Sequence, residues 1–321
     1  MGLTLCRMIS YQITKNYATD FAREAHKVFW CVGAIWRRHG RIVKKAKVRK
    51  MEKITLTKEK ETMLIPLYGK AMDYQQAESM LHDKKAAEIV EAMDYDFSRL
   101  KIQKKTNVMM CMRAAMLDEI TEQKLAAGKT LVLHLGCGLD SRCLRAGQAA
   151  ADWYDVDYPE VIAIRKNFFA ETKTYHMIAS SVTEAEWIES IPNTGFDSVL
   201  VLAEGLVMYL GESAVKTLIA RLKTRFKTFT LVMDVYNTMA AKGAKNHPSL
   251  KQTGVKEFWG FDDPKLLETW GLGLKHRATH HFAEYHLERL TAFDRKLYTL
   301  ISHIQVARNA HRVEIYKIGE G

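Results

Sequence analysis

Five short apolar runs separated by helix-length polar segments constrain the fold of this chain more than any other feature. The runs are 130–135, 151–156, 175–179, 197–203 and 229–235. Each has strand length, and the amphipathic segments 159–171 and 213–227 between them have helix length. Strands that alternate with helices are typical of a parallel sheet covered on both faces. The sequence therefore predicts an α/β fold that is Rossmann-like and doubly wound, with a mostly parallel sheet.

The segments outside these runs complete the expected domain organisation. Residues 51–127 place apolar side chains three and four apart, which predicts a helical cap before the α/β core of 128–321. A helix near 284–303 and a last strand at 312–318 are expected within that core. The long aromatic segment 236–261 is expected to be a lid-like insertion over the substrate, or a pair of helices that completes the core.

Charge is distributed very unevenly along the chain. Of the 48 basic and 37 acidic residues, twelve basic and two acidic ones lie in residues 1–50, so that segment carries +10 of the net +11. We interpret 1–50 as a basic N-terminal extension that is solvated or lies outside the functional chain; a targeting segment and a basic arm for nucleic acid or acidic lipid are the alternatives. Residues 51–321 form a nearly neutral methyltransferase-sized domain, which argues against a nucleic-acid partner.

Cysteine usage and hydropathy address the compartment. The five cysteines form no C-x-x-C pair, and an odd number in a chain of this size indicates a reducing compartment. The longest apolar window near the start, 28–36, is far shorter than the roughly 20 residues that span a bilayer. We therefore expect a cytoplasmic protein with no membrane partner.

The segment 133–142 carries the strongest chemical signal. Gly136 and Gly138 follow the first apolar run directly, so the backbone can turn sharply, approach a ligand closely and leave the next helix N-terminus to an anion. Asp157 lies 21 residues after Gly136, at the spacing of an acid that binds ribose hydroxyls, and Asp155 lies at 19. Strand alternation puts both acids on one face, so spacing alone leaves the choice open. A nucleotide-type ligand is predicted.

The loop favours S-adenosylmethionine over a dinucleotide. A dinucleotide fingerprint requires a third glycine or alanine, whereas this loop continues with Asp140 and Ser141. A carboxylate beside a pyrophosphate is repulsive, but it attracts the sulfonium and ammonium groups of S-adenosylmethionine.

Three motifs in order resemble those of the leucine carboxyl methyltransferase family. They are Leu-Gly-Cys-Gly-Leu-Asp-Ser-Arg at 135–142, Tyr-Asp-Val-Asp-Tyr-Pro-Glu at 154–160 and Leu-Ala-Glu-Gly-Leu-Val-Met-Tyr-Leu at 202–210. Within the family, the chain is more similar to the small-molecule O-methyltransferases that resemble the tetracenomycin polyketide carboxyl methyltransferase. The resemblance implies a class I methyltransferase fold with S-adenosyl-L-methionine as the cofactor, and no metal.

The resemblance also implies roles for individual residues. Arg113 matches an arginine that holds the methionine carboxylate, Gly136 the cofactor-loop glycine and Asp157, rather than Asp155, the ribose-binding acid. Glu204 matches an acid facing the methionine end, and Ser181 stands where some relatives carry an Asp near the adenine amino group. With Gly138 and Asp140 of the loop, these residues form the expected cofactor site.

The acceptor determines whether the reaction requires a base. A carboxylate is nucleophilic at neutral pH, whereas a phenol with a pKa near 10 benefits from a positioned base. Tyr209, His280 and His281 are the candidate bases, and spacing places none of them convincingly beside the methyl group. We expect methyl transfer to a small-molecule carboxylate or hydroxyl, with the carboxylate favoured. The alternatives are a protein C-terminal carboxyl methyltransferase and a nucleic-acid-binding protein with a vestigial methyltransferase domain.

Overall fold

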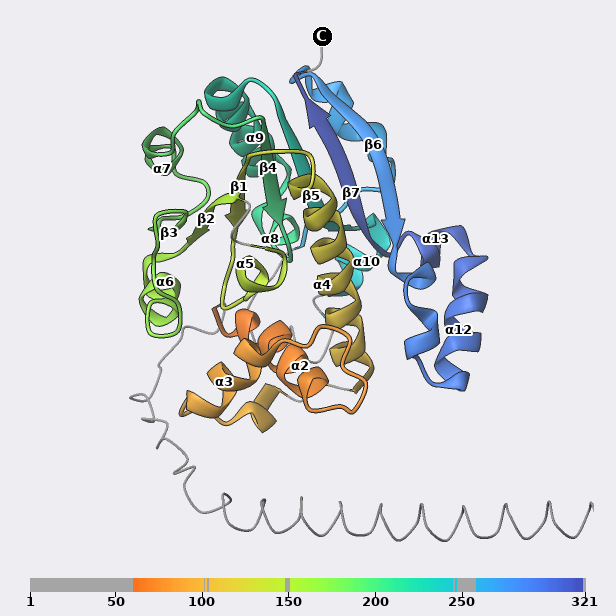
Figure 1. Ribbon diagram of the computed structural model, residues 1–321. Helices are drawn as coiled ribbons and strands as arrows, with labels where there is room; N and C mark the ends of the chain where they lie inside the picture. The colour runs from red at the N-terminus through yellow and green to blue at the C-terminus, as the bar shows by residue number, and fades with distance from the viewer. Residues whose placement is uncertain are drawn as a thin grey trace, which may run out of the picture. The chain divides into compact units, whose positions relative to one another are not determined.

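The central element of the computed structural model is a seven-stranded sheet in the order β3-β2-β1-β4-β5-β7-β6 (Figure 1). Strands β1 to β5 run parallel, and β6 and β7 are antiparallel to their neighbours. The structure describes residues 60–100, 102, 104–147, 151–244, 246 and 258–319. The expected α/β, mostly parallel architecture is confirmed, and the basic segment 1–50 lies outside the described residues.

The strands follow the apolar runs closely. Their bounds are β1 Thr130–Leu135, β2 Ala151–Asp157, β3 Tyr175–Ala179, β4 Ser198–Ala203, β5 Phe229–Tyr236, β6 Leu274–His281 and β7 His311–Ile318. The α-helices are α2 Leu64–Tyr74, α3 Lys84–Ala92, α4 Lys104–Leu125, α5 Arg142–Arg145, α6 Pro159–Arg165, α7 Glu186–Ser190, α8 Val207–Leu210, α9 Glu212–Phe226, α10 Thr238–Ala244, α12 Ala292–Ser302 and α13 Gln305–Arg308. Short 3-10 helices are η1 Lys60–Met63, η2 Phe97–Leu100, η4 Pro264–Trp270, η5 Phe282–Glu284 and η6 Leu287–Arg289.

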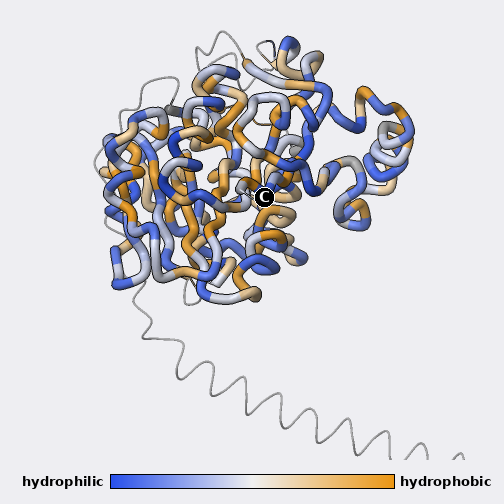
Figure 2. The backbone as a smooth tube through the Cα atoms, turned by 90° about the horizontal axis from the view of Figure 1, so that it is seen from above, coloured by the Kyte–Doolittle hydropathy of each residue, from blue (hydrophilic) through white to orange (hydrophobic). Residues whose placement is uncertain are grey.

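Two apolar cores lie on the two faces of the sheet. Residues of α2, α3, α4 and α6 pack with Val132, Trp153 and Leu202 on one face. Residues of α7, α9 and η4 pack with Leu133 and Val201 on the other. Figure 2 shows the apolar segments mostly in the interior and the hydrophilic ones mostly at the periphery. Burial on both faces explains why these strands appear in the sequence as continuous apolar runs.

Strand β6 was not predicted. Its sequence, LKHRATHH, is polar and basic, and it occupies the edge of the sheet beyond β7. Charged and polar residues are common on edge strands, where they discourage pairing with other chains. A polar edge strand therefore lacks the apolar run by which the other strands were recognised.

Several expected helices are shorter in the structure. Helix α6 ends at Arg165, not near 171, and the helix expected near 284–303 divides into η5, η6 and α12. In the expected lid, α10 begins at Thr238, and Gly260 forms an isolated bridge with Tyr236. Residues 247–257 of that segment lie outside the described residues.

The helical cap lies where the parallel strands end. Figure 1 shows α2 and α3 beyond the edge of the sheet at which β4 ends. Ligands of open α/β sheets bind outside the carboxyl ends of the strands. The cap therefore covers the edge where a ligand is expected. Within the part of the chain that the structure describes, no helix is both long and apolar enough to cross a membrane.

Candidate active site

A cavity of about 940 Å³ opens at the carboxyl ends of the parallel strands. Small-molecule sites typically occupy about 300–1,000 Å³, so this cavity is at the upper end of that range. Its walls come from the cap, the loops after β1, β2 and β4, and the start of β7. The polar and glycine residues among them are Lys70, Arg113, His134, Gly136, Gly138, Asp140, Asp157, Glu204, Gly205, Tyr209, Tyr236 and His311.

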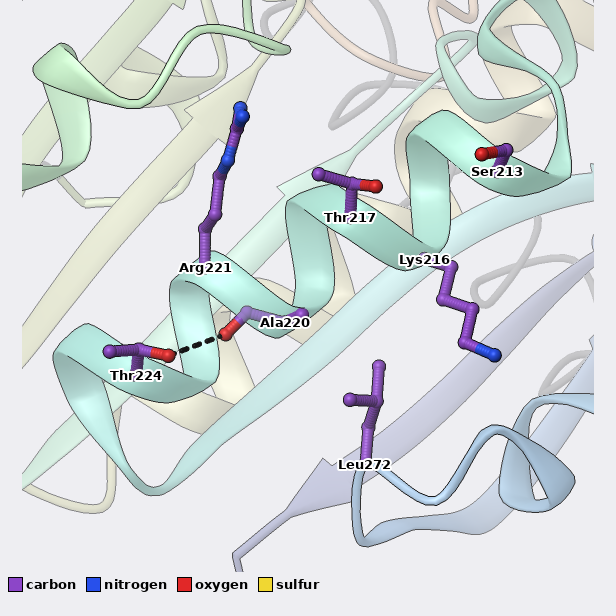
Figure 3. Close-up of a pocket in the computed structure, with 7 residues that line it drawn as sticks. All are labelled: Ser213, Lys216, Thr217, Ala220, Arg221, Thr224 and Leu272. Carbon is purple, nitrogen blue, oxygen red and sulfur yellow. Dashed lines mark hydrogen bonds between the residues drawn. The ribbon is translucent and has the colours of Figure 1, made fainter.

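A second hollow, on the outer surface of α9, is a weaker candidate. Figure 3 shows Ser213, Lys216, Thr217 and Arg221 along one helix, with Leu272 opposite. Its volume is about 400 Å³, and its lining contains no carboxylate or imidazole. None of the sequence motifs contributes to it, so we assign the site to the larger cavity.

The glycine loop binds back on its own strands. Gly136 N donates to Val156 O at 2.8 Å, and Gly138 N donates to Asp157 Oδ2 at 2.7 Å. Helix α5 is a single turn of four residues, and its first amide, Arg142 N, donates to Asp140 Oδ1 at 2.8 Å. The expectation that this helix N-terminus is available to an anion is therefore wrong, because Asp140 already occupies it. A loop whose amides are used in this way is poorly suited to a pyrophosphate.

Gly136 has a φ of +63°, and a Cβ atom added to it would lie 2.9 Å from Leu206 Cδ1. The Gly136→Ala variant should lose about 1–2 kcal/mol of stability from the left-handed backbone and bind S-adenosylhomocysteine more weakly, because Leu206 would move within the cavity. Urea unfolding and calorimetry measure the two effects. Gly147→Ala is the matched control: Gly147 has a φ of +85° and nothing within 4 Å of the added Cβ. Equal affinities in the two variants would contradict the crowding argument.

The structure separates the two acids of β2. Asp155 is fully buried and accepts hydrogen bonds from Arg165, Trp153 and Tyr175. Burial opposes its ionisation, but Arg165 outweighs burial and lowers its pKa to about 2. Asp157 instead lines the cavity and is half-buried.

Asp157 retains the capacity to bind a ligand. Its two oxygens each accept one backbone amide, from Gly138 and Tyr158, both at 2.7 Å. A carboxylate has about four lone-pair sites, so two remain for hydroxyl groups. Burial raises the pKa of Asp157, although the two amides lower it in part.

Arg113 and Glu204 meet at the cavity wall from two distant elements. Arg113 Nε on α4 donates to Glu204 Oε1 at 2.9 Å, and its Nη1 donates to Asp234 Oδ2 at 3.1 Å. Its Nη2 donates to no described residue and is not sealed from solvent. Arg113 therefore has one guanidinium nitrogen available to a ligand carboxylate.

Asp140 is already engaged by cations. Lys70 Nζ lies 2.6 Å from its Oδ2, Arg145 Nη2 lies 3.0 Å from its Oδ1, and Arg142 Nη2 lies 3.7 Å from its Oδ2. Burial opposes ionisation of Asp140, but these cations hold its pKa well below the ordinary value. Its charge is thus largely neutralised inside the protein, which weakens the argument that it repels a pyrophosphate or attracts a sulfonium directly.

These groups belong to one ionic network behind the cavity. Its carboxylates are Asp83, Asp118, Asp140, Glu204 and Asp234, and its cations are Lys70, Arg113, Arg142 and Arg145. Burial disfavours ionised Glu204, but Arg142, Lys70 and Arg113 keep its pKa below its usual range. With five acids and four bases, the network has one uncompensated negative charge.

The other predicted site residues lie in different places. Tyr209 lines the cavity, and burial raises its pKa. His280 and His281 lie on the edge strand β6, and the cavity lining given by the described residues includes neither. Ser181 is also not part of that lining; its hydroxyl lies 2.8 Å from Thr183 Oγ1.

Four residues at the site were missed by sequence reasoning: Lys70, Arg142, Asp234 and His311. Asp234 could have been found, because it lies near the carboxyl end of β5 just as Glu204 follows β4. Lys70 and His311 come from α2 and from the start of an antiparallel strand, so no local pattern marks them.

Comparison with known proteins supplies the family. The model of the leucine carboxyl methyltransferase family matches residues 63–223, about half of the chain. The chain belongs to this family. The matched segment contains the three motifs and most of the cavity wall. The predicted family, the predicted methyltransferase activity and the predicted S-adenosyl-L-methionine cofactor are confirmed.

Individual relatives agree with the family match. The tetracenomycin polyketide synthesis O-methyltransferase TcmP of Streptomyces glaucescens is 36% identical over 226 residues, which cover 70% of this chain and 83% of the relative. The S-adenosyl-L-methionine-dependent methyltransferase dpfgK of Gibberella zeae is 30% identical, with the same coverage of 70% and 83%. A crystal structure of a DUF574 family protein from Streptomyces avermitilis aligns with a TM-score of 0.48 and 13% identity, over 78% of this chain and 97% of that one.

Proposed function

We propose that this leucine carboxyl methyltransferase family member transfers a methyl group to an oxygen atom of a small-molecule acceptor. The observation that carries the proposal is the single cavity lined by Arg113, Gly136, Asp157 and Glu204, which come from four separate parts of the chain. The relative named for tetracenomycin polyketide synthesis is an O-methyltransferase, which supports oxygen as the acceptor atom and a small molecule as its source. It favours these over the protein-carboxyl and nucleic-acid alternatives.

The free groups of the cavity fit S-adenosylmethionine. Asp157 offers acceptor sites for the ribose hydroxyls, and Arg113 Nη2 offers a donor for the amino-acid carboxylate. The single uncompensated negative charge of the network suits a ligand with a sulfonium, an ammonium and one carboxylate, whose net charge is +1. When bound, this cofactor supplies an activated methyl group.

The chain's own residues then bind, orient and shield the reactants. Arg113 and Glu204 hold each other and leave one polar edge each toward the cavity, so the amino-acid end is oriented without prior rearrangement. Gly138 fixes the Asp157 carboxylate through its amide. Met109, Met110 and Leu206 add apolar surface that excludes water from the reacting groups.

Replacing Asp157 with alanine should weaken S-adenosylhomocysteine binding by about 1.5–3 kcal/mol, the range for hydrogen bonds to a charged group, or roughly 10- to 150-fold. Isothermal titration calorimetry on the full chain measures this. Asp152→Ala is the matched control, because Asp152 lies on the same strand and its nearest cation, Lys129, is exposed at 3.8 Å. An Asp157→Ala affinity equal to that of wild type would contradict the ribose assignment.

A further inference from the structure

A histidine and an aspartate form a buried pair at the methionine end of the cavity. His311 Nε2, at the start of β7, lies 2.7 Å from Asp234 Oδ2 at the end of β5. The same oxygen accepts Arg113 Nη1 at 3.1 Å, and Asp234 Oδ1 accepts Gly205 N at 2.5 Å. His311 also lines the cavity. The imidazole is therefore placed next to the arginine that is proposed to hold the amino-acid end of the cofactor.

The second ring nitrogen of His311 is available. The ring is held between Tyr236 and Phe282, with centroid distances of 4.7 and 4.6 Å. Among the described residues Nδ1 has no hydrogen-bond partner, yet it is not a sealed atom. Because a carboxylate accepts at Nε2, that nitrogen carries the proton and Nδ1 carries the lone pair. A carboxylate that fixes the tautomer of a histidine is the arrangement of a general base.

The surroundings keep His311 neutral near pH 7. Burial is the largest influence and lowers its pKa, while the bond to Asp234 opposes the shift only in part. The titratable groups around it are Asp234 and Tyr236 on β5, Arg113 on α4 and Glu204 on β4. Tyr236 stays protonated because burial raises its pKa to about 12. A base whose pKa lies below the ordinary 6.5 remains unprotonated at physiological pH.

We propose that His311 is the catalytic base of this enzyme and that its acceptor is a hydroxyl group, not a carboxylate. The inference deepens the proposed function and rests on it. The expectation of a carboxylate depended on the lack of a histidine beside the methyl group, and His311 now occupies that position. An ionised carboxylate has no proton to give up, so a neutral oriented imidazole would be of no use to it, whereas a phenol with a pKa near 10 requires one.

The step balances as follows in atoms and charge. The acceptor oxygen forms a bond to the methyl carbon, and the carbon–sulfur bond breaks with its electron pair on sulfur, which becomes a neutral thioether. The hydroxyl proton passes to His311 Nδ1, and the resulting imidazolium is stabilised by Asp234 at 2.7 Å. The proton then leaves to water.

The tautomer of His311 is the first test. In the full chain labelled with ¹⁵N-histidine and saturated with S-adenosylhomocysteine, two-bond ¹H–¹⁵N spectra at pH 7.5 should show Nε2 protonated and Nδ1 unprotonated. The signal is assigned by its loss in His311→Asn. A proton on Nδ1, or a doubly protonated ring, would overturn the proposal without any need for an acceptor.

Kinetics provide the second test. The probes are phenols and aryl carboxylic acids that share ring skeletons, such as 1-naphthol and 1-naphthoate, with S-adenosylhomocysteine release as the readout. Phenols should be methylated, and His311→Ala should lower kcat about 100-fold or more while the KM for S-adenosylmethionine changes little. The wild-type rate should fall only below about pH 6.5, because protonation of His311 removes the base; the variant should lack this acid limb. The exposed His303→Ala is the matched control and should behave as wild type.

Transfer to the acids alone, to none of the phenols, or at an unchanged rate in His311→Ala would overturn the inference. Asp234 variants are a less clean test, because Asp234 also binds Arg113. Calorimetry separates the two levels of the account. Failure of the wild type to bind S-adenosylhomocysteine would contradict the proposed function itself. Normal binding combined with an inert His311 would contradict only the assignment of the base.

Discussion

The Glu204→Ala variant should lose about 3–5 kcal/mol of unfolding free energy, the range for a buried ion pair that loses one partner. Glu204 accepts from Arg113 at 2.9 Å and from Arg142 at 2.5 Å, and Arg142 is fully buried. Removing the carboxylate leaves two guanidinium groups undercompensated in a site closed to water. We also expect binding of S-adenosylhomocysteine to weaken at least 10-fold, because Arg113 loses the partner that orients it.

Urea unfolding followed by circular dichroism measures the stability of this variant, and calorimetry its affinity. The exposed Glu189→Ala is the matched control and should change stability by no more than about 0.5 kcal/mol. Glu204→Gln, which keeps the shape and removes the charge, should fall between alanine and wild type. A Glu204→Ala protein as stable as the control would show that the network is not the buried unit described here.

Arg165→Met should destabilise the protein by a similar amount, about 3–5 kcal/mol. Arg165 and Asp155 are both fully buried, and their side chains are bonded to each other. Methionine fills the space of the arginine stem but leaves the carboxylate without its cation. The matched control is Lys166→Met, the exposed neighbour, whose pair with Glu171 at 3.9 Å is worth at most about 1 kcal/mol.

This pair also makes stability depend on pH. The pKa of Asp155 is lowered to about 2 from its ordinary 3.8, so ionised Asp155 contributes stability that is present above about pH 4 and is lost as pH falls toward 2. Acid titrations of unfolding should show this loss in wild type and lack it in Arg165→Met. A variant with the same acid dependence as wild type would contradict the assignment of the lowered pKa to Arg165.

The strands and the acids at their ends were predictable because their signals are local. A strand buried on both faces must be apolar along its length, and Leu200, Val201 and Leu202 of β4 illustrate this. The carboxyl end of such a strand is where ligands bind, so Glu204 and Asp157 could be placed at the edge of the sheet without coordinates. Gly136 was predictable for the same reason, as the residue at which the backbone must turn.

The choice between Asp155 and Asp157 required the structure. Both acids lie on one face of β2, and alternation cannot distinguish them. The deciding residue is Arg165, which lies one helix further along the chain and occupies the Asp155 carboxylate. Only the packing of α6 on the sheet reveals that Asp155 is structural and Asp157 is free.

The base was mispositioned by sequence reasoning for a topological reason. His280 and His281 were chosen because they precede the last strand, but β6 takes them to the outer edge of the sheet. Strand β7 inserts between β5 and β6 and runs antiparallel, so its first residue, His311, pairs with the end of β5. An antiparallel strand brings its N-terminal residue to the carboxyl edge of parallel neighbours, and this placement has no local sequence signature.

A crystal structure of the full chain with S-adenosylhomocysteine tests the central claim most directly. The account predicts the ribose hydroxyls within hydrogen-bond distance of the Asp157 carboxylate and the amino-acid carboxylate on Arg113 Nη2, with Asp155 still bonded to Arg165. It also predicts the sulfur atom at the end of the cavity that His311 lines. Ligand density outside this cavity, or ribose hydroxyls on any acid other than Asp157, would contradict the account.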